Sequence, residues 1–210
     1  PGKKLKKKDG LEVPRIGVRF RIPHVMNRVE YFGRGPVENY VDRNAGSMVG
    51  RYKTSVEEMY VNYVRPQENG HRTDTRWVSF TNTAGRGLLV LAEKTIGFNA
   101  LRNTVEDFDS EESSHPYQWR NLSSKEVACK NEAEAKNVLR RMTHVNDITP
   151  RDFVEVCIDM KQQGVAGYDS WGAKVQPGYT IPASRDYVWG FTLIPIKNVG
   201  DVNKSLRYTY

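Results

Sequence analysis

Two segments of the chain alternate between apolar and polar positions, and this alternation constrains the fold more than any other feature. The first is RIGVRFRI at residues 15–22, and the second is FVEVCIDM at residues 153–160. Because successive side chains of a strand point to opposite faces of a sheet, each segment places its aliphatic residues on one face. Both are predicted to be strands of an antiparallel sheet with a core on one side.

Shorter runs of the same kind fill much of the remaining chain, with turn residues between them. The further strands that we expect are residues 27–32, 48–54, 76–81, 87–93, 98–102 and 187–196. One helical stretch, residues 124–142, interrupts them: Ser123 and Glu126 fit a capping box ahead of an Ala-, Glu- and Lys-rich run. The predicted fold class is mainly all-β, an antiparallel sandwich with one or two short helices.

The composition permits a real core. Hydrophobic residues make up 38% of the 210 residues, including eleven Tyr, seven Phe and four Trp, which argues against disorder. No apolar run approaches the roughly 18 residues that cross a membrane, so we expect no membrane partner. The chain opens at Pro1 without an initiating Met. We therefore interpret it as an excerpt, whose parent protein could be cytoplasmic or periplasmic.

The net charge of +7 is concentrated at the start of the chain. Five lysines and one aspartate lie within residues 1–10, so more than half of the excess charge comes from this segment. We interpret it as a solvated basic linker, and a nucleic-acid-binding arm is the alternative. No basic stripe follows downstream, so no nucleic-acid partner is expected.

Metal and cofactor motifs are not recognisable. Cys129 and Cys157 have no CxxC spacing, and the four histidines are scattered along the chain, so we expect packed thiols and no zinc site. There is no Gly-x-Ser-x-Gly elbow, phosphate loop or dinucleotide fingerprint. We expect no cofactor in this chain.

Two polar loops carry carboxylates that are candidates for a catalytic role. Glu38 with Asp42, and Glu68 with Asp74, are the candidates for a glycosidase pair, which needs two carboxyls roughly 5 to 9.5 Å apart. Each acid also has an arginine nearby in sequence, and an arginine lowers the pKa of a carboxyl group and ties loops together. These arginines are Arg34, Arg43, Arg65 and Arg76. We favour the structural interpretation.

A tryptophan between two glycines is the strongest candidate for ligand contact. In GYDSWG, residues 167–172, the glycines allow sharp turns and leave Trp171 without bulky neighbours. An indole offers a flat apolar face and a polar N–H, which suits the C–H face and the hydroxyl rim of a sugar. The alternative is that Trp171 closes the end of the sandwich as a core residue.

Three motifs carry a family resemblance: GRGPVENYVDR at 33–43, RPQENG at 65–70 and GYDSW at 167–171. In this order they strongly resemble the C-terminal domain, or small chain, of bacterial β-galactosidases of glycoside hydrolase family 2. The likeness runs from about residue 14 to residue 195.

The resemblance implies an antiparallel supersandwich similar to that of galactose mutarotases. It also implies that the two catalytic glutamates, with Mg and Na, belong to other domains of a parent enzyme that hydrolyses terminal β-galactosides and is a homo-oligomer. The family's sugar-stacking tryptophan matches Trp171, and Asp169 and Ser170 beside it are weaker substrate-binding candidates. No catalytic or metal-binding residue is assigned to this chain, and the isolated fragment is expected to be inactive.

The chain departs from the family at its ends. The expected organisation is a linker at 1–10, a small-chain domain at 11–196 that lacks its first strands, and a tail at 197–210 without a family counterpart. Missing strands would expose sheet edges and favour self-association.

Two other functions remain open. A stand-alone aldose epimerase would need a facing acid and base, for which His71 or His144 with Glu155 or Asp159 are the candidates. A carbohydrate-binding module, or a polyanion-binding module acting through the lysine segment, is the other alternative.

Overall fold

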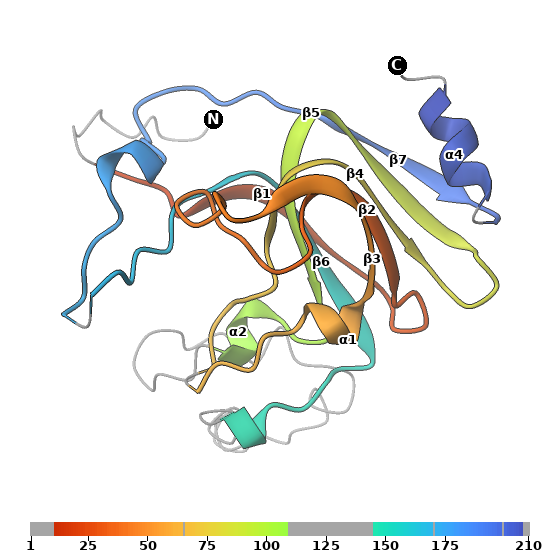
Figure 1. The fold of residues 1–210 in the computed structure, drawn as a ribbon, viewed down its shortest axis with the longest axis horizontal. Helices are drawn as coiled ribbons and strands as arrows, with labels where there is room; N and C mark the ends of the chain where they lie inside the picture. The colour runs from red at the N-terminus through yellow and green to blue at the C-terminus, as the bar shows by residue number, and fades with distance from the viewer. Residues whose placement is uncertain (1–10, 65, 109–144, 170, 199, 208–210) are drawn as a thin grey trace, which may run out of the picture.

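The computed structural model describes residues 11–64, 66–108, 145–169, 171–198 and 200–207 (Figure 1). Within these ranges seven strands form one antiparallel sheet. The strands are β1 (Arg15–Pro23), β2 (Arg28–Gly35), β3 (Met48–Ser55), β4 (Arg72–Thr81), β5 (Gly87–Leu101), β6 (Phe153–Gln162) and β7 (Phe191–Ile196). The helices are α1 (Val56–Met59), α2 (Val105–Phe108) and α4 (Gly200–Arg207), with 3-10 turns at Val145–Asp147 and Pro177–Tyr179.

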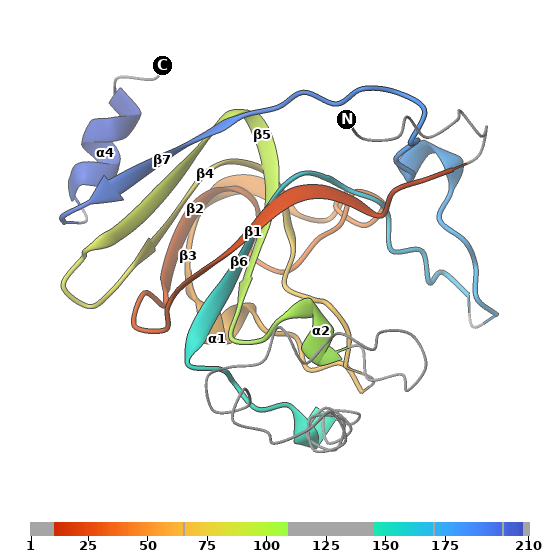
Figure 2. The ribbon, with the colours of Figure 1, turned by 180° about the vertical axis from the view of Figure 1, so that it is seen from behind.

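The long strand β5 organises the sheet. The strand order is β1-β6-β5-β4-β2-β3, and β7 also pairs with β5. The first part of β5, residues 87–92, pairs with β7, whereas residues 97–101 pair with β6. Since a single strand serves both neighbours, the sheet bends around β5, and its curvature is visible from both sides (Figures 1 and 2).

One face of the sheet carries the main core. The aliphatic positions of β6, namely Val154, Val156 and Ile158, are fully buried there with Phe80 and Phe98. The short helices α1 and α2 add Val56, Met59 and Phe108 to the same core. A capping box between Ser55 and Glu58 starts α1, because it satisfies backbone N–H groups that the first turn leaves free.

The opposite face is divided between an apolar half and a polar half. Helix α4 lies beside β7 and covers the apolar half (Figure 1). Its Val202 packs with Trp77, Leu89, Leu91 and Ile196. The polar half carries Glu155, Cys157 and Asp159 of β6, all buried, and burial raises the pKa of the Cys157 thiol to about 12.

The mainly antiparallel all-β fold predicted from the sequence is confirmed. The two strands expected at 87–93 and 98–102 are one continuous strand, β5. Val18, expected to face the core, is 45% exposed, since β1 pairs only with β6 among the described strands and its register shifts between Ile16 and Gly17. The predicted helical stretch at 124–142 lies outside the described residues, and the domain boundaries at residues 10 and 196 stay predictions.

Candidate functional site

Trp171 lies within a long loop that follows β6. The loop, residues 163–180, projects from the end of the molecule opposite α4 (Figures 1 and 2). Trp171 is 92% exposed. The structure therefore does not place it in the core, which was the alternative for this position. The positive φ angles of Gly167 and Gly172, 76° and 79°, are the conformations that glycine adopts without strain.

Asp169 shapes the turn around this tryptophan. One oxygen, Oδ1, accepts hydrogen bonds from the backbone N–H groups of Trp171 at 2.8 Å and Ala173 at 3.1 Å. This is the local side-chain-to-backbone bonding that favours aspartate in turns. Whether Asp169 also contacts substrate stays a prediction, and Ser170 lies outside the described residues.

The base of the loop is tied to the motif at residues 33–43. The carboxylate Oδ2 of Asp42 accepts a 2.9 Å hydrogen bond from the N–H of Ala166. Gly164 makes this approach possible, because a Cβ there would lie 2.5 Å from the same oxygen. Ala166 itself has a φ of 53°, which is uncommon for a residue with a side chain. Asp42 therefore holds the loop in a conformation that it would not favour alone.

Glu38 ties the same motif to the second polar loop. It accepts hydrogen bonds from the N–H of Gly70 at 2.7 Å and from the hydroxyl groups of Tyr63 and Tyr40. The Tyr63 hydroxyl donates to one carboxylate oxygen, and the Gly70 N–H and the Tyr40 hydroxyl donate to the other. The side chain thus acts as a link between loops, which agrees with the structural interpretation of this acid.

The other two acids of the catalytic hypothesis pair with arginines. Asp74 forms a 2.5 Å ion pair with Arg34, which is distant in sequence, whereas the neighbouring Arg76 donates to the backbone carbonyl of Asp74. Glu68 pairs with Arg15 of β1, a partner that local sequence did not indicate. All four candidate carboxylates thus have structural partners.

Arg15 also belongs to a buried polar cluster on the polar half of the sheet. Its guanidinium donates two 2.6 Å hydrogen bonds to Asp159 and one of 3.3 Å to Asn99. Burial disfavours the charge of Arg15, but the hydrogen bond to Asp159 and the neighbouring charges leave its pKa raised. Burial raises the pKa of Asp159 as well, against the effect of Arg15.

His71 lies against this cluster. Its Nδ1 is 3.8 Å from Oδ2 of Asp159, and its ring stacks on Tyr40 with centroids 5.5 Å apart. Burial, with the charges of Arg15 and Arg72, lowers the pKa of His71 to about 3. An efficient general base has a pKa near the working pH, so this histidine is poorly suited to the proton transfer of an epimerase.

Glu155, the other described acid of the epimerase hypothesis, pairs with arginines. It lies 3.3 Å from Arg19 and 3.4 Å from Arg21, atom to atom, and His144 lies outside the described residues. His71 with Asp159 was among the pairs expected from the sequence, although no sequence signal placed the two together. The one hint in the sequence was that Arg15 and Asp159 both occupy polar positions of strands in which apolar and polar residues alternate.

A broad hollow of about 1080 Å³ lies between the Trp171 loop and β1. Its wall includes Arg15, Glu68, Gly164, Ala166 and Gly172. The tryptophan loop and the buried polar cluster therefore border the same surface depression.

The described residues contain no group of three or more His, Cys, Asp or Glu side chains arranged to hold a metal ion. None of their helices is long and apolar enough to cross a membrane.

Comparison with known families shows to which family the chain belongs. The model of the family described as beta galactosidase small chain matches residues 3–193. The chain belongs to the β-galactosidase small chain family. The match covers most of the chain and includes the Asp42 and Trp171 loops, whereas α4 lies beyond it.

Individual relatives agree with this assignment. A β-galactosidase of Priestia megaterium is 36% identical over 185 residues, which is 88% of this chain and 15% of that protein. One from Halalkalibacterium halodurans is 30% identical over 87% of this chain and 15% of its own length. One from Streptococcus thermophilus is 28% identical, with the same coverage of both chains. The chain thus spans about 15% of the length of the curated relatives that it matches.

Proposed function

We propose that this small chain is a non-catalytic part of a larger β-galactosidase that hydrolyses terminal, non-reducing β-galactosides. In this proposal Trp171 lines the position of the sugar beyond galactose, in an active site formed on a barrel domain. The observation that carries it is the 92% exposure of Trp171 on a loop anchored by Asp42. A large aromatic side chain left exposed on an anchored loop is a feature of contact surfaces.

The chemistry would take place outside this chain. Retaining glycosidases use two carboxyl groups about 5 to 5.5 Å apart, one of them uncharged. Glu38, Asp42, Glu68 and Asp74 instead have the linking roles given above. The catalytic glutamates, and the Mg and Na that assist them, are proposed to lie on the other domains of the parent enzyme, which we propose is a homo-oligomer.

The physical contribution of Trp171 would be stacking and exclusion of water. One aromatic face adds about 0.5–1.5 kcal/mol beyond the area that it buries. The isolated chain should therefore bind a sugar at this position only weakly. The barrel would have to supply the remaining contacts.

The test uses the full-length parent enzyme with Trp171→Ala and Trp171→Phe. For a galactoside whose leaving group is a second sugar, Trp171→Ala should raise KM about tenfold, while Trp171→Phe keeps much of the stacking. Inhibition by galactose alone should hardly change. Val188→Ala is the matched control, because Val188 is also highly exposed, at 90%, in another segment.

Two results would count against the proposal. Unchanged KM values for every leaving group in Trp171→Ala would remove the stacking role. Hydrolysis of a β-galactoside by the purified 210-residue chain would place the catalytic groups here instead.

A further inference from the structure

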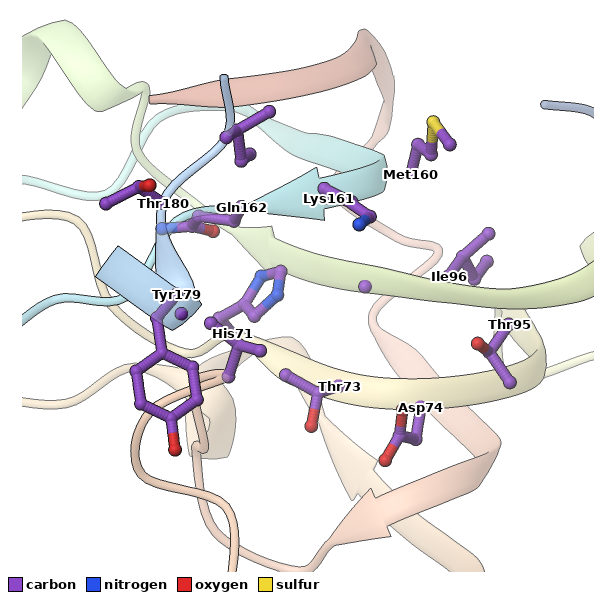
Figure 3. A pocket seen from close by; sticks show the side chains of 14 residues that line it. His71, Thr73, Asp74, Thr95, Ile96, Met160, Lys161, Gln162, Tyr179 and Thr180 are labelled. Atoms are coloured by element: carbon purple, nitrogen blue, oxygen red, sulfur yellow. The ribbon is translucent and has the colours of Figure 1, made fainter. Parts of the chain in front are cut away.

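A second, smaller hollow lies on the polar half of the sheet. It has a volume of about 240 Å³ and is bordered by the start of β4, the middle of β5, the end of β6 and residues 178–181 (Figure 3). Pockets for drug-sized ligands have volumes of about 300–1,000 Å³. This hollow is therefore suited to a smaller molecule.

Two buried polar atoms beside the hollow have no hydrogen-bond partner among the described residues. They are Nδ1 of His71 and Oε1 of Gln162, and both side chains line the hollow, where they lie near each other (Figure 3). His71 is only 2% exposed. A buried polar group without a partner costs about 1–3 kcal/mol. Nδ1 of His71 faces the Asp159 carboxylate at 3.8 Å, so the atom that calls for a partner in the hollow is Oε1 of Gln162.

Gly97 lets the ring of His71 pack against the backbone of β5. A Cβ at this position would lie 2.5 Å from both Cε1 and Nε2 of the imidazole, so a side chain there would displace the ring. The Asp159 carboxylate, 3.8 Å from Nδ1, favours the tautomer with its proton on Nδ1. Nε2 then carries the lone pair and can accept a hydrogen bond.

The chemistry of the wall defines the class of ligand. Nε2 of His71 and Oε1 of Gln162 are both acceptors, so they need a ligand with at least two O–H or N–H donors. The hydroxyl groups of Thr73 and Thr180 already donate to Asn39 and to the carbonyl of Pro177, so toward a ligand they too can only accept. Ile96 and Ile181 add apolar surface. The Asp74 carboxylate in the wall is already paired with Arg34, which removes the main attraction for a cation.

We propose that this hollow binds one small, neutral, polyhydroxylated molecule of the size of a single sugar ring, through His71 and Gln162. This site is separate from Trp171 and does not depend on the function proposed for that residue.

The experiment titrates D-galactose, and in parallel myo-inositol, into the 15N-histidine-labelled chain and follows the ring nitrogens of His71 by NMR. Saturable shifts with a dissociation constant in the millimolar range are expected, about −4 kcal/mol of binding free energy. Cyclohexanol, a ring of similar size with one hydroxyl group, should produce no saturable shift. Trp171→Ala should bind galactose at His71 as the unchanged chain does.

Gln162→Leu is the decisive variant. It should weaken binding about tenfold or more and leave the Tm unchanged or higher, because it removes an unpaired buried acceptor. Gln163→Leu is the matched control, since Gln163 borders the larger hollow but not the smaller one, whereas Gln162 lines both. Gly97→Ala provides a second variant, which should weaken binding by pushing the ring of His71 out of place, because the new Cβ would lie 2.5 Å from Nε2.

Several outcomes would overturn the proposal. One is the absence of any saturable response of His71 to either polyol at concentrations on the order of 100 mM, which would leave water as the occupant. Another is unchanged binding by Gln162→Leu or Gly97→Ala. A fall in the Tm of Gln162→Leu without loss of binding would show that Gln162 has a purely structural role.

Discussion

Asp42 accepts a 2.9 Å hydrogen bond from the backbone N–H of Ala166, a residue 124 positions away in sequence. This contact joins the motif at residues 33–43 to the loop that presents Trp171. The loop's exposed tip therefore depends on a carboxylate that has no direct part in the proposed sugar contact.

Asp42→Ala should loosen the Trp171 loop. The substitution leaves the N–H of Ala166 without its acceptor, at a cost of about 1–3 kcal/mol, and the strained φ of Ala166 loses its support. Amide hydrogen exchange over residues 164–173 should become faster, while exchange in β4 and β5 stays slow. Asp42→Asn retains an acceptor oxygen and should restore most of the protection.

The control for this prediction is Asp186→Ala, which removes an exposed acid from another segment. If loop exchange in Asp42→Ala matched that of the control, the hydrogen bond to Ala166 would not be holding the loop.

Trp171→Ala should change the free energy of unfolding by no more than about 0.5 kcal/mol, as is usual for exposed positions. Trp77→Ala is the matched comparison, because Trp77 is 3% exposed under α4 and should cost about 3–5 kcal/mol. Urea unfolding of the two variants measures the difference. A large loss in Trp171→Ala would mean that its ring packs against the protein.

The strands of the sheet could be predicted from the sequence because apolar and polar residues alternate along them. The prediction divided β5 into two strands, although it is one long strand that changes partner. The alternation also assigned Val18 to the core, although Val18 is exposed on an edge strand. Partner changes and edge positions are properties of strand order, which local pattern does not contain.

The site was predictable only where its signals are local. Two glycines around Trp171 predict an exposed ring, and the ring is exposed. The pairing of Arg15 with Glu68 and Asp159, and the contact of His71 with Asp159, join residues that are far apart in sequence. The Arg15–Asp159 pair depends on the register of β1 with β6, and the contacts of Glu68 and His71 depend on the position of the segment before β4. Neither was predictable from one strand alone.

Val202→Ala should destabilise the protein although α4 lies outside the family match. Val202 is 1% exposed against Trp77, Leu89 and Leu91, and the loss of two buried methyl groups costs about 1.6 kcal/mol at about 0.8 kcal/mol each. A fall in Tm of roughly 3–6 °C is expected for a chain of this size. Asn203→Ala, at an exposed position of the same helix, is the control, and equal Tm values for both variants would show that α4 is not docked on the sheet.

The stability of the fold should fall as the pH is lowered through the range in which free histidine titrates. Burial, with the charges of Arg15 and Arg72, lowers the pKa of His71 to about 3, against about 6.5 in an unfolded chain. Between these values the unfolded state binds the extra proton, so the free energy of unfolding decreases by about 1.4 kcal/mol per pH unit as the pH falls. His71→Phe removes this titration and keeps an aromatic ring against Tyr40, which stacks on His71. Urea unfolding at pH 7.5, 6 and 5 should therefore show the unchanged chain losing about 2 kcal/mol relative to the variant by about pH 5. Parallel pH profiles for the two proteins would mean that His71 titrates normally and is not held neutral by its surroundings.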